Sequence, residues 1–98
     1  MNQWLEYKKY ANSHEYFTRK ELKENSLHGN TIDNYINLTA KSGFIKKTGR
    51  GQYTRILKIP NFISSSLILK LSYDKEKREK ILITIIRKEK LENIRNQS

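Results

Sequence analysis

The sequence predicts a mainly α-helical domain that carries one small β-hairpin and continues into a C-terminal helical extension. In the first half of the chain, apolar residues recur at the spacing of helices. After Phe44 the spacing changes to the alternation of strands, on both sides of a glycine-rich turn at residues 48–51. From residue 61 onward the pattern is again mostly helical. We therefore expect one unit over residues 1–60 and a helical segment over residues 61–98.

The first helix is predicted over residues 2–12, where one face forms an apolar stripe. The stripe consists of Trp4, Tyr7, Tyr10 and Ala11. After the break at residues 13–15, residues 15–17 are expected to be either a very short strand or a plain linker.

The second helix is predicted over residues 19–25 because a strong start signal precedes it. Thr18 can cap the helix, and Glu21 stands three residues later, where it completes a capping box. Phe17 and Leu22 occupy the two positions of a hydrophobic staple. Since Leu22 is the one apolar residue within it, this helix is expected to lie over the core as a short strut.

The third helix is predicted over residues 31–42. Leu27 in the preceding turn is expected to be a buried plug, and Asn30 is expected to cap the helix. Gly43 should end it in the left-handed conformation, with Phe44 packing behind it.

At 100° per residue, this third helix has two unlike faces. Its apolar side is formed by Ile32, Tyr35, Ile36 and Thr39. The amide-rich and basic side is formed by Asn30, Asn34, Asn37 and Lys41.

The hairpin is predicted from two strands, residues 44–47 and 52–59, with Pro60 closing the second. In the C-terminal segment, serines 64–66 can cap one helix, and residues 74–96 form another. The β-branched run 81–86 reads equally well as a strand when taken alone. Its charged flanks, with opposite charges four residues apart, favour a helix.

Positive charge is concentrated in residues 41–58, which hold six basic and no acidic residues out of a formal net charge of +10. Such uneven placement favours a polyanionic partner and makes nucleic acid the first partner to consider. The competing interpretation is a charged strand edge that discourages aggregation. Because solvated surfaces usually mix both signs of charge, we favour contact with phosphates.

Several kinds of chemistry lack their sequence signals. There is no cysteine, and His14 and His28 have no acidic partners at ligand spacing, so we expect no disulfide, metal or other cofactor. No catalytic motif is present, so we expect no enzymatic activity. The longest apolar run is far short of the roughly 20 residues that span a bilayer. We expect a soluble cytoplasmic protein, associated with the nucleoid.

The order of elements over residues 17–60 resembles the winged helix-turn-helix family. The resemblance rests on residues 31–36 (TIDNYI), residues 42–45 (SGFI) and the Gly-Arg-Gly of the hairpin. It implies that the third helix enters the major groove of duplex DNA while the hairpin, the wing, follows the backbone or minor groove. The family usually has an apolar residue four positions before the terminating glycine, where this chain has Thr39. Leu38 then falls near the edge of the face expected to be outside.

The candidate DNA contacts lie on these elements. Asn34 and Asn37 suit adenine, which an amide can bind through two hydrogen bonds, although a solvated helix face is the alternative. We expect the cations of the hairpin to contact phosphates, and Arg50 at its tip could also enter a minor groove. The full candidate set is Arg19, Lys20, Asn30, Thr31, Asn34, Asn37, Lys41, Lys46, Lys47, Arg50, Gln52, Tyr53 and Arg55.

Apolar residues of the C-terminal segment are expected to form a seam between two copies of the chain. The alternative is that they pack within one chain, against the first helix. The seam would consist of Leu67, Leu71, Leu82, Ile85, Ile86, Leu91 and Ile94.

The function expected from these features is duplex DNA binding by a homodimer, as a small transcriptional regulator or a control protein of a mobile element. One alternative is a module for single-stranded DNA or RNA in replication, with Tyr53 as a stacking platform. A second alternative is an adaptor that uses the winged-helix scaffold to recruit a protein.

Overall fold

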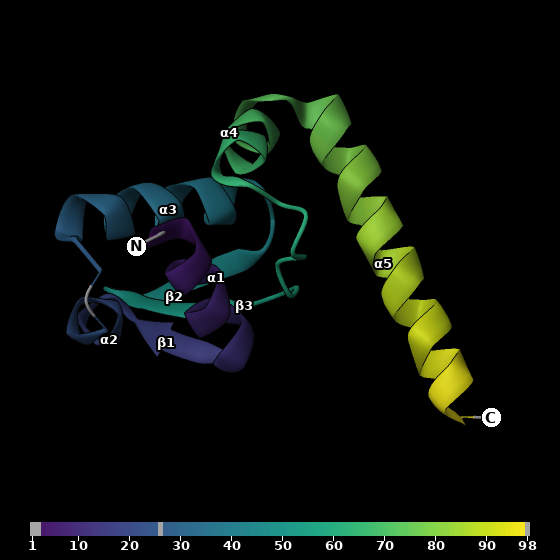
Figure 1. Cartoon of the computed structure of the whole chain (residues 1–98), viewed down its shortest axis with the longest axis horizontal. Coiled ribbons are helices and arrows are strands. Elements are labelled where there is room, and N and C mark those ends of the chain that lie inside the picture. The colour runs from purple at the N-terminus through teal and green to yellow at the C-terminus, as the bar shows by residue number, and fades with distance from the viewer. Residues whose placement is uncertain (1–2, 26, 98) are drawn as a thin grey trace.

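The computed structural model describes residues 3–25 and 27–97, with side chains up to residue 88. This part of the chain is mainly helical and contains one small antiparallel sheet, which confirms the predicted fold class (Figure 1). The elements in chain order are α1 (Gln3–Ser13), β1 (Tyr16–Thr18), α2 (Arg19–Glu24), α3 (Gly29–Lys41), β2 (Ile45–Gly49), β3 (Gln52–Arg55), α4 (Ser65–Tyr73) and α5 (Lys75–Gln97).

The sheet has the strand order β1-β3-β2, and both pairings are antiparallel. Residues 16–18 form a true strand, because Phe17 lies opposite Tyr53 on β3. The prediction that the second hairpin strand continues to residue 59 was wrong, since β3 ends at Arg55. Beyond it, the N–H groups of Ile56 and Leu57 both donate to the carbonyl of Phe44, which turns the chain away from the sheet.

Residues 56–64, here called the linker, are held against α1 by polar side chains. Trp4 Nε1 donates to the carbonyl of Ile63 at 2.8 Å, and Lys8 Nζ donates to the same oxygen at 3.1 Å. The Asn12 amide pairs with the backbone of Ile59 in both directions, at 2.9 Å and 2.8 Å. These bonds give partners to backbone groups of Ile59 and Ile63. In a sheet, a neighbouring strand would supply such partners.

Lys8 is a buried residue, which is unusual for a lysine. Its aliphatic stem and amine lie beside the Trp4 ring, with Nζ 5.8 Å from the ring centroid. Burial lowers the pKa of the Lys8 amine below its ordinary value. The two carbonyls it binds, of Asn61 and Ile63, offset part of the cost of burying it.

Thr18 caps α2 as predicted, but among the described residues no hydrogen bond from its N–H to the Glu21 carboxylate completes the capping box. Thr18 Oγ1 accepts a hydrogen bond from the N–H of Glu21 at 3.1 Å. The Glu21 carboxylate accepts a hydrogen bond from the Tyr10 hydroxyl at 2.6 Å, which ties α2 to α1. Phe17, Leu22 and Leu27 are all buried, as expected for the staple and the plug.

The predicted cap of α3 was wrong. The helix begins at Gly29, so the N-cap residue is His28, and Asn30 is an exposed residue of the first turn. The hydrogen bond from Ile32 N–H to the carbonyl of His28, at 2.8 Å, closes the first turn two positions earlier than predicted. The predicted end was right, because Gly43 has a φ of 89° and Phe44 is fully buried behind it.

The polar residue on the inner face of α3 has a specific partner. Thr39 is buried, and its hydroxyl donates to the carbonyl of Tyr35 at 2.7 Å. The same oxygen lies 2.7 Å from the Tyr7 hydroxyl, which therefore acts as the donor between them. Leu38 is also buried, and it belongs to the same core cluster as Ile68 and Leu71 of α4. The hydroxyl of Thr39 thus has a partner on α1, and Leu38 lies in a core to which the C-terminal helices contribute.

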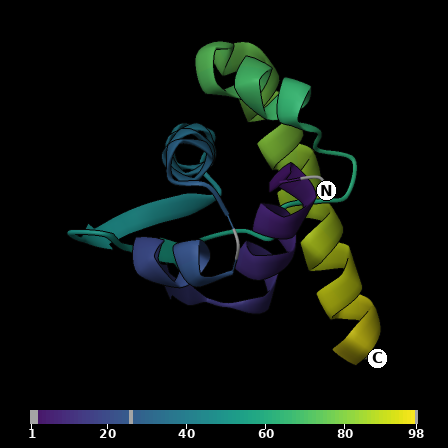
Figure 2. The ribbon, with the colours of Figure 1, turned by 60° about the vertical axis from the view of Figure 1, so that its left-hand side comes forward.

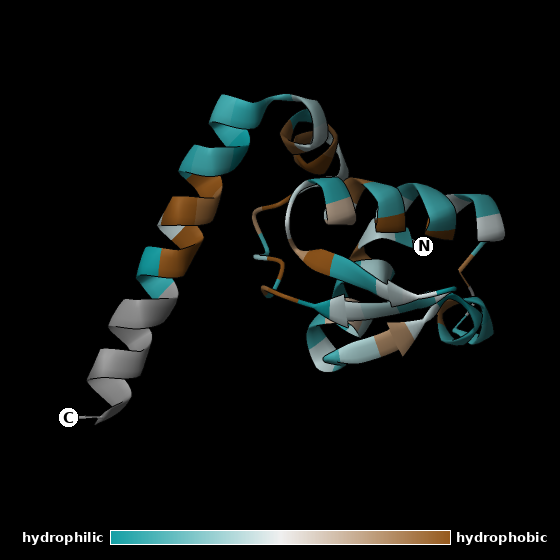
Figure 3. Ribbon diagram, turned by 180° about the vertical axis from the view of Figure 1, so that it is seen from behind, coloured by the Kyte–Doolittle hydropathy of each residue, from teal (hydrophilic) through white to brown (hydrophobic). Residues whose placement is uncertain are grey.

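The C-terminal segment shares the core of the rest of the chain. Ile63, Ile68, Leu71 and Ile85 belong to the same buried cluster as the apolar residues of α1 and α3. Ser64 caps α4 by accepting from the N–H of Leu67, as expected. The run 81–86 is helical and forms the apolar middle of α5 (Figure 3).

Replacing Asn12 by Ala should destabilise the fold by roughly 1–3 kcal/mol, because the N–H and carbonyl of Ile59 lose their partners. Asn37→Ala is the matched control, since it makes the same change at an exposed helical position. Urea unfolding monitored by circular dichroism measures both. Equal midpoints for the two variants would contradict a structural role for Asn12.

Alkaline pH should destabilise the protein through Tyr10. Burial and the hydrogen bond to Glu21 raise the pKa of Tyr10 from 10.0 to about 12. The stabilising contribution is therefore complete below pH 10 and is lost as the pH rises through about 12, because only the unfolded chain releases the proton in between.

The Tyr10→Phe variant should accordingly lose less stability between these two pH values than the unmodified protein does, by on the order of 1–2 kcal/mol. Tyr16→Phe, at an exposed tyrosine, is the control. Urea unfolding at a series of pH values gives the comparison, and parallel curves for Tyr10→Phe and the unmodified protein would rule the mechanism out.

Candidate nucleic-acid interface

The outer face of α3 carries amides and one lysine. Burial of Ile32, Ile36 and Thr39 on the inner side fixes the rotation of the helix. The predicted outer residues are all exposed, and they are Asn30, Asn34, Asn37 and Lys41. Thr31 is half-buried at the edge of this face. The helical period therefore predicted the orientation of the amides correctly.

The hairpin of β2 and β3 presents its cations to solvent. Lys46 and Lys47 are exposed on β2, which is an edge strand, and Arg50 is exposed in the turn. Gly51 has a φ of 69°, which supplies the left-handed position that the turn requires. Gln52 is exposed directly after the turn.

The hairpin lies beside α3, and its tip points away from α5. Figures 1 and 2 show the hairpin tip on the opposite side of the molecule from α5, with α3 lying along the sheet. Figure 2 views α3 almost end-on and shows the hairpin projecting beside it. The exposed amides of α3 and the cations of the hairpin thus belong to one end of the structure.

The single carboxylate within α3 and the hairpin is neutralised. Asp33 is the one acidic residue of these elements, and Arg19 of α2 binds it through two hydrogen bonds, Nε–Oδ1 at 2.7 Å and Nη2–Oδ2 at 3.1 Å. These hydrogen bonds lower the pKa of Asp33, so the pair stays ionised. Arg19 is paired with Asp33, so its charge is already compensated within the fold. Lys20 beside it is exposed to solvent.

Arg55 has a different role from the one predicted for it. Its guanidinium Nη1 donates to the carbonyls of Ala11 at 3.1 Å and Asn12 at 2.8 Å. These are terminal carbonyls of α1, which have no partner within the helix. Arg55 therefore caps α1 and we leave it out of the candidate surface.

Tyr53 is half-buried on β3. Its ring stacks on Phe17, with centroids 5.9 Å apart and planes inclined by 27°. One side of the ring is thus used within the fold. A more exposed tyrosine nearby is Tyr16 on the edge strand β1, which pairs with Thr54.

Contacts from α5 to the end of α3 were not predicted from the sequence. Arg78 Nη1 donates to the carbonyl of Lys41 at 2.8 Å. The side chain of Leu82 packs directly against Gly43. A Cβ atom added to Gly43 would lie only 3.3 Å from Leu82 Cδ1. No local pattern distinguishes Arg78 from the other cations of α5, because its partner is a carbonyl brought near by the fold.

The residues predicted to form a dimer seam are partly used within the chain. Leu71 and Ile85 are buried in the core, Leu67 and Leu82 are half-buried against it, and Ile86 is exposed. The side chains of Leu91 and Ile94 lie outside the described residues. Part of the set is therefore used within one chain, where α4 packs against α3 and α5, and a homodimer stays a prediction.

Among the residues whose side chains the structure describes, no group of three or more His, Cys, Asp or Glu side chains could hold a metal ion. Within residues 3–25 and 27–97, no helix is long and apolar enough to cross a membrane. Comparisons with protein-family models, curated proteins and solved structures gave no match.

Proposed function

We propose that the protein binds duplex DNA through α3 and the hairpin, as a small regulator of transcription or of a mobile element, acting at the nucleoid in the cytoplasm. One observation carries this proposal. The four exposed cations of these elements face solvent without an unpaired carboxylate among them, because Arg19 neutralises Asp33. The four are Lys41, Lys46, Lys47 and Arg50.

The dimensions of α3 support a duplex as the partner. Its 13 residues give a rod about 20 Å long, and an α-helix with side chains matches the width of about 12 Å of the major groove. The exposed Asn34 and Asn37 would then face base edges, while the hairpin lies beside α3 at the height of the phosphates. Tyr53 offers less to single-stranded bases, since its ring already stacks on Phe17.

Removing the three hairpin cations should weaken duplex binding by at least about tenfold and reduce the salt slope of log K by about 2 to 3. The variant is Lys46→Gln, Lys47→Gln and Arg50→Gln in one chain. Fluorescence anisotropy with a duplex and with its single strand, at several salt concentrations, measures both quantities.

The matched control removes three exposed cations from the start of α5, as Lys75→Gln, Lys77→Gln and Lys80→Gln. This control should leave the salt slope of duplex binding almost unchanged. Equal losses of duplex affinity in both triple variants would show that only net charge matters and would refute the proposed surface. A higher affinity for the single strand would favour the single-strand alternative. Affinity for neither would favour the adaptor.

Asn34 and Asn37 should select adenine. In a binding selection from random duplexes, the unmodified protein should enrich A·T pairs at defined positions. Asn34→Ala and Asn37→Ala should each weaken the preference for an A·T pair at one of these positions, by roughly 1–3 kcal/mol of discrimination per amide contact. Asn61→Ala, on the linker, is the control. Unchanged preferences in both α3 variants would show that α3 does not read bases.

A further inference from the structure

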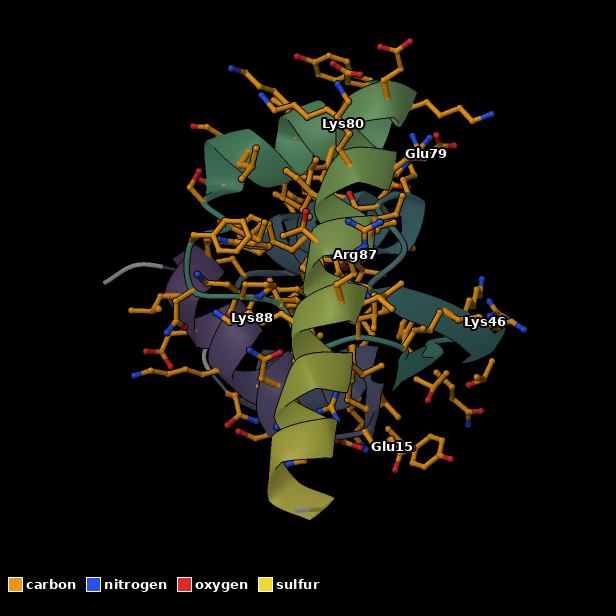
Figure 4. The ribbon with its side chains drawn as sticks, turned by 90° about the vertical axis from the view of Figure 1, so that its right-hand side faces the viewer. Glu15, Lys46, Glu79, Lys80, Arg87 and Lys88 are labelled. Atoms are coloured by element: carbon orange, nitrogen blue, oxygen red, sulfur yellow. The ribbon has the colours of Figure 1, made fainter. Side chains whose placement is uncertain are left out.

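A groove of about 480 Å³ lies between the linker and α5. The linker contributes Lys58, Pro60 and Phe62 to its lining, and α5 contributes Thr84, Ile85 and Lys88. In Figure 4, Lys88 lies on one side of α5 and Lys46 on the other. The groove is therefore separate from the hairpin surface proposed to bind DNA.

Both walls of the groove are fixed by contacts outside it. Hydrogen bonds from Trp4, Lys8 and Asn12 hold the linker backbone. The other wall, α5, is held at the end of α3 by the bond from Arg78 to the carbonyl of Lys41 and by Leu82 packed beside Gly43. Because neither wall depends on an occupant, the groove is preformed, which lowers the cost of binding.

The lining combines an apolar body with a positive rim. Phe62 is 60% exposed although it is a large aromatic residue, and it stands with Pro60 and Ile85 in the lining. Lys58 and Lys88 are exposed, and neither forms an ion pair with a described carboxylate. Among the side chains that the structure describes, no acidic one lines the groove. The complementary occupant is apolar along its length and carries a negative charge at one end.

Size decides between a small molecule and a protein segment. Pockets of roughly 300–1,000 Å³ are typical of small ligands, whereas a specific protein interface uses about 20–30 residues on each side. Seven residues line this groove. We infer that it binds a small amphiphilic carboxylate, whose apolar chain lies against Phe62 and whose carboxylate lies at the rim formed by Lys58 and Lys88.

Octanoate is a suitable probe, with 1-octanol as its uncharged counterpart. Titration followed by ¹H–¹⁵N chemical shifts should give a saturable response confined to residues 58–62 and 84–88. The double variant Lys58→Gln and Lys88→Gln should weaken octanoate roughly three- to tenfold, the range that two exposed ion pairs produce, and should leave 1-octanol unchanged. Phe62→Ala should weaken both probes.

The control variant Lys46→Gln and Lys47→Gln removes the same charge from the hairpin and should leave octanoate binding intact. The inference fails if octanoate gives no saturable shift, or if both double variants weaken it equally. It also fails if the groove resonances respond to protein concentration instead of octanoate, because a second copy of the chain would then be the occupant. None of these outcomes depends on whether the protein binds DNA.

Discussion

Three side chains on one stripe of α1 hold the backbone of the linker, and the positions of most other elements follow from this contact. Trp4, Lys8 and Asn12 are spaced four residues apart, so they lie above one another along the helix. Together they bind backbone groups at Ile59, Asn61 and Ile63. Buried backbone N–H and C=O groups need hydrogen-bond partners, which secondary structure usually supplies. In the linker, these side chains supply them instead, so the linker is ordered without a helix or strand of its own.

The ordered linker determines how the two halves of the chain meet. It leads to α4, which packs against α3, so that the C-terminal helices contribute to the core. The outer face of α3 and the hairpin keep their amides and cations in solvent. The proposed DNA surface and the proposed ligand groove thus lie on different sides of one framework, and the linker that α1 holds forms one wall of the groove.

The sequence predicted those features that depend on neighbouring residues. The cap at Thr18, the stop at Gly43 and the exposed face with Asn34 follow from spacing alone and appear in the structure. The roles of Lys8 and Arg55 could not be predicted, because both bind carbonyls of segments more than forty residues away. For the candidate site, helical periodicity predicted the exposure of the α3 amides, whereas the pairing of Arg19 with Asp33 required the packing of α2 on α3.

The hydrogen bond from Arg78 to the carbonyl of Lys41 has a consequence for synthesis of the chain. The ribosome makes α3 before α5, so water must hydrate the exposed carbonyl of Lys41 until the guanidinium of Arg78 replaces it. The side chain of Leu82 likewise reaches Gly43 only after that part of α5 has been made. The last turn of α3, which carries Lys41, is therefore completed by residues from the second half of the chain.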